Sequence, residues 1–230
     1  MERGLDLSRQ GLTAIAQIPR DVARQVERDG EPYTLSIAQN RLTQVHDIHV
    51  FKHVVQLDLS GNQLHTLDGI GALRFVESLN VARNGLVSID VLVELPRLRV
   101  LNAAENRLET IGAVSEWKAI VALDVSFNNI AKWPQLVHAT TLELGSQCWN
   151  SFQTIDLSSN ALEGLPVASA GRVFPSGLRR LSLAKNRISS LCGVASLGLY
   201  LEQLQIIKLD GNPAYQNVLR EGGSLDFMWT

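Results

Sequence analysis

Three histidines and an aspartate lie close together in the stretch HDIHVFKH, where they are His46, Asp47, His49 and His53. Imidazole and carboxylate groups bind zinc and act as general acids and bases, so the stretch is a candidate for a metal site or for acid-base chemistry. Ile48 and Phe51 alternate with these polar residues and are expected to face the core. We therefore expect the histidines to lie on the surface, and a metal site is the less favoured interpretation.

The cysteines and the short catalytic motifs give no second candidate. Cys148 and Cys192 form no CxxC pair and have no histidine nearby in the sequence, so neither is expected to be a nucleophile or a ligand. The chain contains no phosphate-binding loop motif, no HExxH zinc motif and no GxSxG elbow. We therefore expect no catalytic residue, no metal, no cofactor and no enzymatic activity.

Composition and charge restrict the class of partner. The 230 residues include 45% hydrophobic residues, enough to supply a core, and 21 basic against 23 acidic residues give a formal charge of −2. Such a balance gives no overall attraction to nucleic acid or to an anionic membrane. With no apolar run of membrane-spanning length, no signal-peptide pattern and no disulfide framework, we expect an intracellular, cytoplasmic protein.

One pattern organises almost the whole chain. Asparagines recur every 22 residues at Asn40, Asn62, Asn84, Asn106 and Asn128, and the same frame continues with wider spacing at Asn160, Asn186 and Asn212. Around each of them the sequence reads L-x-x-L-x-L-x-x-N-x-L, and an opening copy carries Gln10 in place of asparagine. The centres of the predicted strands are Leu5, Leu35, Leu57, Leu79, Leu101, Leu123, Ile155, Leu181 and Ile207.

This frame resembles the leucine-rich repeat family. The 22-residue units are similar to the intracellular class that includes a protein phosphatase 1 regulatory subunit, an axonemal dynein light chain and a spliceosomal ribonucleoprotein subunit. The resemblance implies an α/β repeat fold. It is a right-handed solenoid of about nine rungs, with a curved parallel β-sheet on the concave face and 3₁₀ or short α-helical segments on the convex face.

The physical chemistry of the residues agrees with that fold. Leu57 and Leu59 alternate as the inward residues of a short strand, and each asparagine has donors and an acceptor for the backbone of its turn. Apolar residues spaced three apart, such as Ile70 and Leu73, suit a short, tight return segment that is 3₁₀-like or extended. Trp117 and Trp133 fall in such segments and are expected to be core residues.

Two departures from the spacing divide the chain. The sequence IPRDVARQVERDG predicts a helix from near Pro19 to Gly30, and a 32-residue gap separates Leu123 from Ile155. We interpret the chain as one domain, 1–230. Its parts are an N-terminal rung with a helical insertion (1–31), regular 22-residue repeats (32–137), an insertion (138–151), longer repeats (152–212) and a C-terminal cap or tail (213–230).

Residues that alternate with the inward leucines are expected to line the concave face. The central row is Asp6, Ser36, Asp58, Asn80, Asn102, Asp124, Asp156, Ser182 and Lys208, and the next row is Ser8, Ala38, Ser60, Ala82, Ala104, Ser126, Ser158, Ala184 and Asp210. About half of this pattern is expected to serve the repeat itself, because LDLSxN is a common form of it.

The candidate partner-binding residues depart from the small, acidic pattern of those rows. Val100, Val121 and Phe127 place apolar side chains on the middle rungs, next to Asp124. At the C-terminal end, five cations gather on adjacent rungs, namely Arg179, Arg180, Lys185, Arg187 and Lys208. This basic cluster favours an acidic protein segment or a phosphate, and a merely solvated charged end is an equal alternative.

Two tryptophans have no core position in the frame. Trp149, in the insertion 138–151, is expected either to fold the insertion back onto the solenoid or to contact a partner. Trp229, in the tail GGSLDFMWT, either caps the open end together with Tyr215, Val218 and Leu219 or docks onto a partner.

These features predict a non-enzymatic scaffold or adaptor that binds protein partners in a larger intracellular assembly. A cytoskeletal or axonemal assembly is favoured by the resemblance, and a nuclear location stays open. The alternatives are a protein phosphatase regulatory subunit and a ribonucleoprotein component, for which only the basic cluster speaks, so RNA is a less favoured partner. No membrane partner is expected, and nothing in the sequence implies a homo-oligomer.

Overall fold

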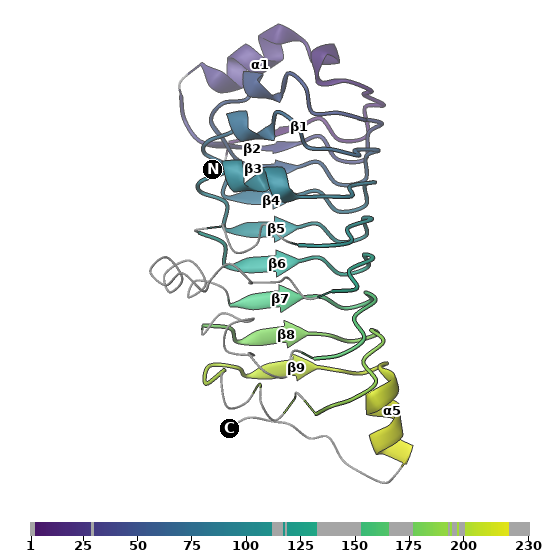
Figure 1. The fold of residues 1–230 in the computed structure, drawn as a ribbon. Coiled ribbons are helices and arrows are strands. Elements are labelled where there is room, and N and C mark those ends of the chain that lie inside the picture. Colours follow the sequence, from purple (N-terminus) through teal and green to yellow (C-terminus); the bar gives the residue numbers. More distant parts are fainter. Residues whose placement is uncertain are drawn as a thin grey trace.

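The computed structural model describes residues 3–28, 30–111, 117, 119–132, 153–165, 177–192, 194, 197 and 201–220. Within these residues, nine strands form one parallel sheet whose order follows the chain (Figure 1). The strands are β1 (Gly4–Asp6), β2 (Tyr33–Ser36), β3 (Val54–Asp58), β4 (Ser78–Asn80), β5 (Val100–Asn102), β6 (Ala122–Asp124), β7 (Thr154–Asp156), β8 (Arg180–Ser182) and β9 (Ile206–Lys208). The predicted right-handed solenoid is confirmed.

The strand register confirms every predicted strand centre. Leu5 pairs with Leu35, and the pairing of one centre with the next continues without a gap to Leu181 and Ile207. β6 pairs directly with β7 through Leu123 and Ile155 although 32 residues separate them. β6 and β7 are therefore neighbours in the sheet, and the predicted insertion 138–151 lies outside the described residues.

The inward residues of the frame form one continuous core. Leu57 and Leu59 are almost completely buried, as are the equivalent residues of the following rungs up to Leu183, whereas Ile207 in the last strand is partly buried. The tight returns are 3₁₀ helices, as predicted: η2 (Ile48–Val50), η3 (Ile70–Ala72) and η4 (Asp90–Glu94). Trp117 is also buried, with 4% of its surface exposed, which confirms its core position, whereas Trp133 lies outside the described residues.

A ladder of buried asparagines joins the rungs. Asn106 accepts a hydrogen bond from the backbone N–H of Leu86 (3.0 Å) and donates to the carbonyls of Val81 (3.0 Å) and Ala103 (3.1 Å). Two of these partners belong to the preceding rung and one to its own. The same three-way pattern recurs at Asn62, Asn84, Asn128, Asn160, Asn186 and Asn212. Gln10 is exposed and does not reproduce it.

Helices lie at both ends of the sheet. The predicted N-terminal helix is confirmed as α1 (Arg20–Glu27), which begins after Pro19, and η1 (Ile15–Gln17) precedes it. At the other end, α5 (Pro213–Arg220) follows β9, and Tyr215 packs half-buried against the core (Figure 1). Val194 and Leu197 are helical and buried, in agreement with a wider, helical return between β8 and β9.

The carboxylate of Glu27, the last residue of α1, connects this helix to the next two rungs. Glu27 accepts hydrogen bonds from the buried Tyr33 hydroxyl (2.6 Å) and from the backbone N–H of His53 (3.0 Å), and its second oxygen lies 2.5 Å from His53 Nδ1. The expectation that His53 is a plain surface histidine is therefore wrong. The His53 ring is partly buried, since Glu27 of α1 contacts it, and it also stacks on Phe75. His46 and His49 are exposed, as expected.

These contacts perturb two ionisation equilibria. Burial raises the pKa of Glu27, but the hydrogen bonds from Tyr33 and His53 outweigh it and hold the pKa below its ordinary value. Burial, followed by the bond to Glu27, raises the pKa of Tyr33. Glu27 is thus held as a carboxylate and Tyr33 as a neutral donor.

We expect Asn106→Ala to lower the free energy of unfolding by about 3 kcal/mol, because it leaves the buried N–H of Leu86 without its acceptor and removes one of the two amide donors at each of the Val81 and Ala103 carbonyls. Asn102→Ala, in the same rung, removes one partly exposed bond to the N–H of Ala104 and should cost below about 1 kcal/mol. Urea denaturation of both variants measures the difference. Equal costs would contradict the structural role of the ladder.

We expect Glu27→Gln to lower the free energy of unfolding by about 2 kcal/mol at neutral pH. Since the folded pKa of Glu27 is depressed, its contribution is present above the ordinary value of 4.5 and is lost as the pH falls through the lower folded value. Denaturation of the wild type and the variant from neutral pH to about pH 3 should show the two curves converging in acid. Glu31→Gln, at an exposed carboxyl, is the control; a gap that persists in acid would refute the assignment.

Candidate functional site

The central row of the concave face is first a structural feature. In β6, the Asp124 carboxylate accepts a hydrogen bond from the N–H of Ser126 (2.9 Å). The side chains at the same position in β1, β3, β4, β5 and β7 likewise accept from the backbone N–H of the residue two positions later in the chain. This bond turns the chain at the end of the strand. At Asp6 the hydroxyl and N–H of Ser8 lower the carboxyl pKa.

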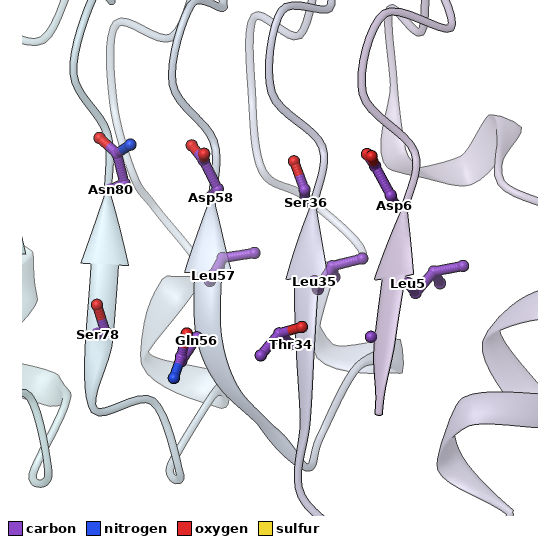
Figure 2. A pocket seen from close by; sticks show the side chains of 11 residues that line it. Leu5, Asp6, Thr34, Leu35, Ser36, Gln56, Leu57, Asp58, Ser78 and Asn80 are labelled. Atoms are coloured by element: carbon purple, nitrogen blue, oxygen red, sulfur yellow. The ribbon is translucent and has the colours of Figure 1, made fainter. Parts of the chain in front are cut away.

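Figure 2 shows this row at the N-terminal end of the sheet. Asp6, Ser36, Asp58 and Asn80 stand side by side at the ends of β1 to β4, and Thr34, Gln56 and Ser78 form a second row beside them. Together they line a shallow groove of about 570 Å³ that contains no cationic side chain. The N-terminal part of the concave face is therefore polar with an acidic bias.

The expectation that the next row lines the concave face is wrong for its alanines. Ala38, Ala82, Ala104 and Ala184 are buried, and so is Ser126. The hydrogen-bonded turn made by the central row begins at the end of the strand, so the strict alternation of side chains does not continue to the next row. The buried members of the next row offer little surface to a partner.

The next residue of every rung has a left-handed backbone conformation. This left-handed row consists of Arg9, Gln39, Gly61, Arg83, Glu105, Phe127, Ser159, Lys185 and Gly211, with φ between 54° and 74°. The N–H of each residue from Arg9 to Lys185 donates to a carbonyl of the following rung; that of Phe127, for example, donates to Ser158 (3.0 Å). The stack requires this conformation, which costs about 1–2 kcal/mol for a residue other than glycine.

Phe127 is the unusual member of the left-handed row. Its side chain is 55% exposed, its φ is 54°, and an aromatic residue is rarely found in this conformation. Neither burial nor a hydrogen bond of the phenyl ring explains its presence. Exposed apolar surface combined with backbone strain is typical of a residue kept for recognition.

The other two apolar candidates lie at the opposite end of the strands from Phe127. Val100, 43% exposed, starts β5, and Val121 immediately precedes β6. Both line a groove of about 290 Å³ together with Val55, Glu77 and Arg99. Phe127 follows the C-terminal end of β6 and does not line this groove. The sequence placed the three residues on neighbouring rungs, but the structure separates them into two surfaces.

The cationic candidates lie on two neighbouring rungs, but Arg179 and Arg180 are at the N-terminal end of β8 and Lys185 follows its C-terminal end. We call Arg179, Arg180, Lys185 and Lys208 the basic end; all four side chains are exposed on β8, β9 and the turns beside them. Arg180 pairs in register with Ile206, and Lys208 pairs with Ser182. None of the four forms an ion pair with a described residue. Trp149 and Trp229, the remaining candidates, lie outside the described residues.

The described residues contain no arrangement suited to catalysis or metal binding. No group of three or more His, Cys, Asp or Glu side chains in this part of the chain is placed to hold a metal ion. Cys192 is exposed, and its sulfur contacts the Ser190 hydroxyl (3.0 Å). Glu27 and His53 contact each other, but Tyr33, their third partner, is buried in the core. In the same residues, no helix is long and apolar enough to cross a membrane.

Sequence reasoning missed the left-handed row, although a signal was present. Gly61 and Gly211 occupy the residue before the asparagine in two rungs, and glycine is the residue that adopts positive φ most readily. Two glycines at one repeat position predict that the position is left-handed in every rung. With that rule, Phe127 would have been recognised as strained as well as apolar.

Comparison with known proteins bears on the fold. No protein-family model and no curated protein sequence matches the chain. Among solved structures, an internalin (inlF) from Listeria monocytogenes superposes with a TM-score of 0.69 at 16% identity, over 91% of this chain and 55% of that one. This chain thus spans about half the length of that internalin.

Two further solved structures agree. Internalin C2 (inlC2) from Listeria monocytogenes gives a TM-score of 0.66 at 19% identity, over 90% of this chain and 80% of that chain. The leucine-rich repeat domain of APL1B gives a TM-score of 0.60 at 20% identity, over 78% of this chain and 48% of that chain. At these identities the likeness concerns the fold alone. The nine-stranded sheet, the asparagine ladder and these neighbours together show that the chain has the leucine-rich repeat fold.

Proposed function

We propose that this chain is a non-enzymatic protein-binding module that serves as a scaffold or adaptor subunit of a larger intracellular assembly. Repeat solenoids use their extended concave surface to bind partners. The observation that carries the proposal is Phe127, an exposed aromatic side chain on a strained backbone at the rim of that surface. The fold would be more stable with glycine or asparagine there, so a function outside folding accounts for the phenylalanine.

The proposed setting is a cytoskeletal or axonemal assembly. It is supported by the similarity of the 22-residue units to the intracellular repeat class that includes an axonemal dynein light chain. A ribonucleoprotein complex is the second candidate, because the unpaired cations of the basic end suit an anionic partner. For a phosphatase regulatory subunit, the repeat resemblance is the sole support. The identity of the captured partners separates these settings.

We expect Phe127→Gly to raise the free energy of unfolding by about 1 kcal/mol, because glycine removes the left-handed strain. The same change should remove the main partner from affinity purifications quantified by mass spectrometry, because the exposed ring is lost. A stabilised protein that no longer binds is the combination expected of a residue kept for recognition.

Ser159→Gly is the matched control for that experiment. It relieves the same backbone conformation in the next rung (φ 54°) without removing an apolar side chain. It should stabilise the fold to a similar degree and keep the partner. If Phe127→Gly retains its partners at the level of Ser159→Gly, Phe127 is not the anchor and the proposal loses its support.

A further inference from the structure

Neighbours in the left-handed row pair with one another along the solenoid. Arg9 Nε donates to Gln39 Oε1 (2.6 Å), and Arg83 Nε lies 2.9 Å from Glu105 Oε1 in an ion pair. In both cases the residue on the following rung supplies the acceptor. The cations of this row in the N-terminal half of the sheet are thus satisfied within the molecule.

Lys185 is the exception in this row. The residue on its following rung is Gly211, which has no side chain, and a Cβ built on Gly211 would lie 3.0 Å from Lys185 Cγ. The Lys185 ammonium is exposed and forms no ion pair with a described residue. It is therefore available to an acceptor from outside the chain.

Of the other cations of the basic end, Lys208 pairs with the last residue of β8, towards Lys185, whereas Arg179 and Arg180 lie at the N-terminal end of β8. Lys208 on β9 and Arg180 on β8 face the same concave surface, and Arg179 adjoins Arg180. The nearby acids, Asp156 and the exposed Asp210, form no ion pair with these cations and are outnumbered by them. The surface of β8 and β9 thus carries a local positive charge on a chain with net charge −2.

The same surface has an apolar component at each side of the charges. Ile206 is 41% exposed and pairs in register with Arg180. Phe127 lies two rungs before Lys185 in the left-handed row, with only Ser159 between them. Adjacent strands are about 4.8 Å apart, so the phenyl ring and the ammonium are anchored roughly 10 Å from each other. An extended chain covers that distance in about three residues.

We propose that Phe127, Lys185 and Lys208 together bind one extended, acidic segment of a partner protein, which crosses the strands from β6 to β9. An apolar side chain of the segment packs on Phe127. Asp or Glu residues about three positions further along meet Lys185 and Lys208. This inference rests on the proposed protein-binding function and adds the chemistry of the partner.

The surface suits such a peptide better than RNA. Single-stranded nucleic acid is held by a row of aromatic side chains on which successive bases stack, together with cations that follow the phosphates. Among the described residues from β6 to β9, the large exposed hydrophobic side chains are the aromatic Phe127 and the aliphatic Ile206. An aliphatic residue among cations matches a segment of mixed apolar and acidic residues.

Selection of peptides from a random phage-displayed library on the purified chain tests this inference. We expect the selected peptides to carry Asp or Glu about three positions from an apolar residue. A synthetic peptide of the selected sequence should bind about tenfold more weakly to a Lys185→Glu, Lys208→Glu double variant. The control is Lys52→Glu with Lys132→Glu, which makes the same change in net charge at exposed lysines elsewhere and should leave the affinity unchanged.

The remaining outcomes separate this inference from the proposed function. Selected peptides that need Phe127 but show no enrichment of acidic residues would overturn the acidic segment and leave the protein-binding role standing. Peptides that need the lysines but bind equally to Phe127→Gly would overturn the shared segment. A selection that yields no binding peptide, combined with single-stranded RNA binding lost in the lysine variant, would replace the inference with a nucleic-acid function.

Discussion

One buried asparagine per rung is the interaction on which the rest of this structure depends. Each side chain spans two rungs, as Asn106 does when it accepts from Leu86 and donates to Val81 and Ala103. An unpaired amide in that position would be costly, so a rung is satisfied only when its neighbour is present. This dependence fixes both the stacking of the rungs and the spacing of every side chain on the concave face.

The same constraint determines the backbone that displays the candidate site. To place the asparagine under the turn, the preceding residue takes a left-handed conformation, and its N–H bonds to the following rung. Glycine at Gly61 and Gly211 meets this demand without strain. Phe127 adopts the same conformation with backbone strain, and the stack of rungs holds its exposed side chain in a defined position. The scaffold thus supplies the rigidity that an exposed anchor residue needs for binding.

Charge follows the repeat as well. Because side chains of one row are a single strand spacing apart, an arginine on one rung reaches an acceptor on the next, and Arg83 with Glu105 shows this pairing. Lys185 meets Gly211, where no acceptor exists. In a regular repeat, a cation whose neighbouring rung offers no acceptor therefore stays unpaired. Such cations give a local basic surface to a chain whose total charge is nearly balanced.

By itself the sequence determined the fold, the nine strand centres and the helix α1, because the leucine and asparagine spacing repeats one local set of contacts in every rung. It also placed Arg179, Arg180, Lys185 and Lys208 on neighbouring rungs, as the structure does. Only the tertiary structure showed that Val100 and Val121 share a groove that Phe127 does not line, since the lining of a groove depends on how side chains of neighbouring rungs pack. The contact of Glu27 with His53 likewise joins segments 26 residues apart, and it depends on how α1 packs, which no repeat pattern encodes.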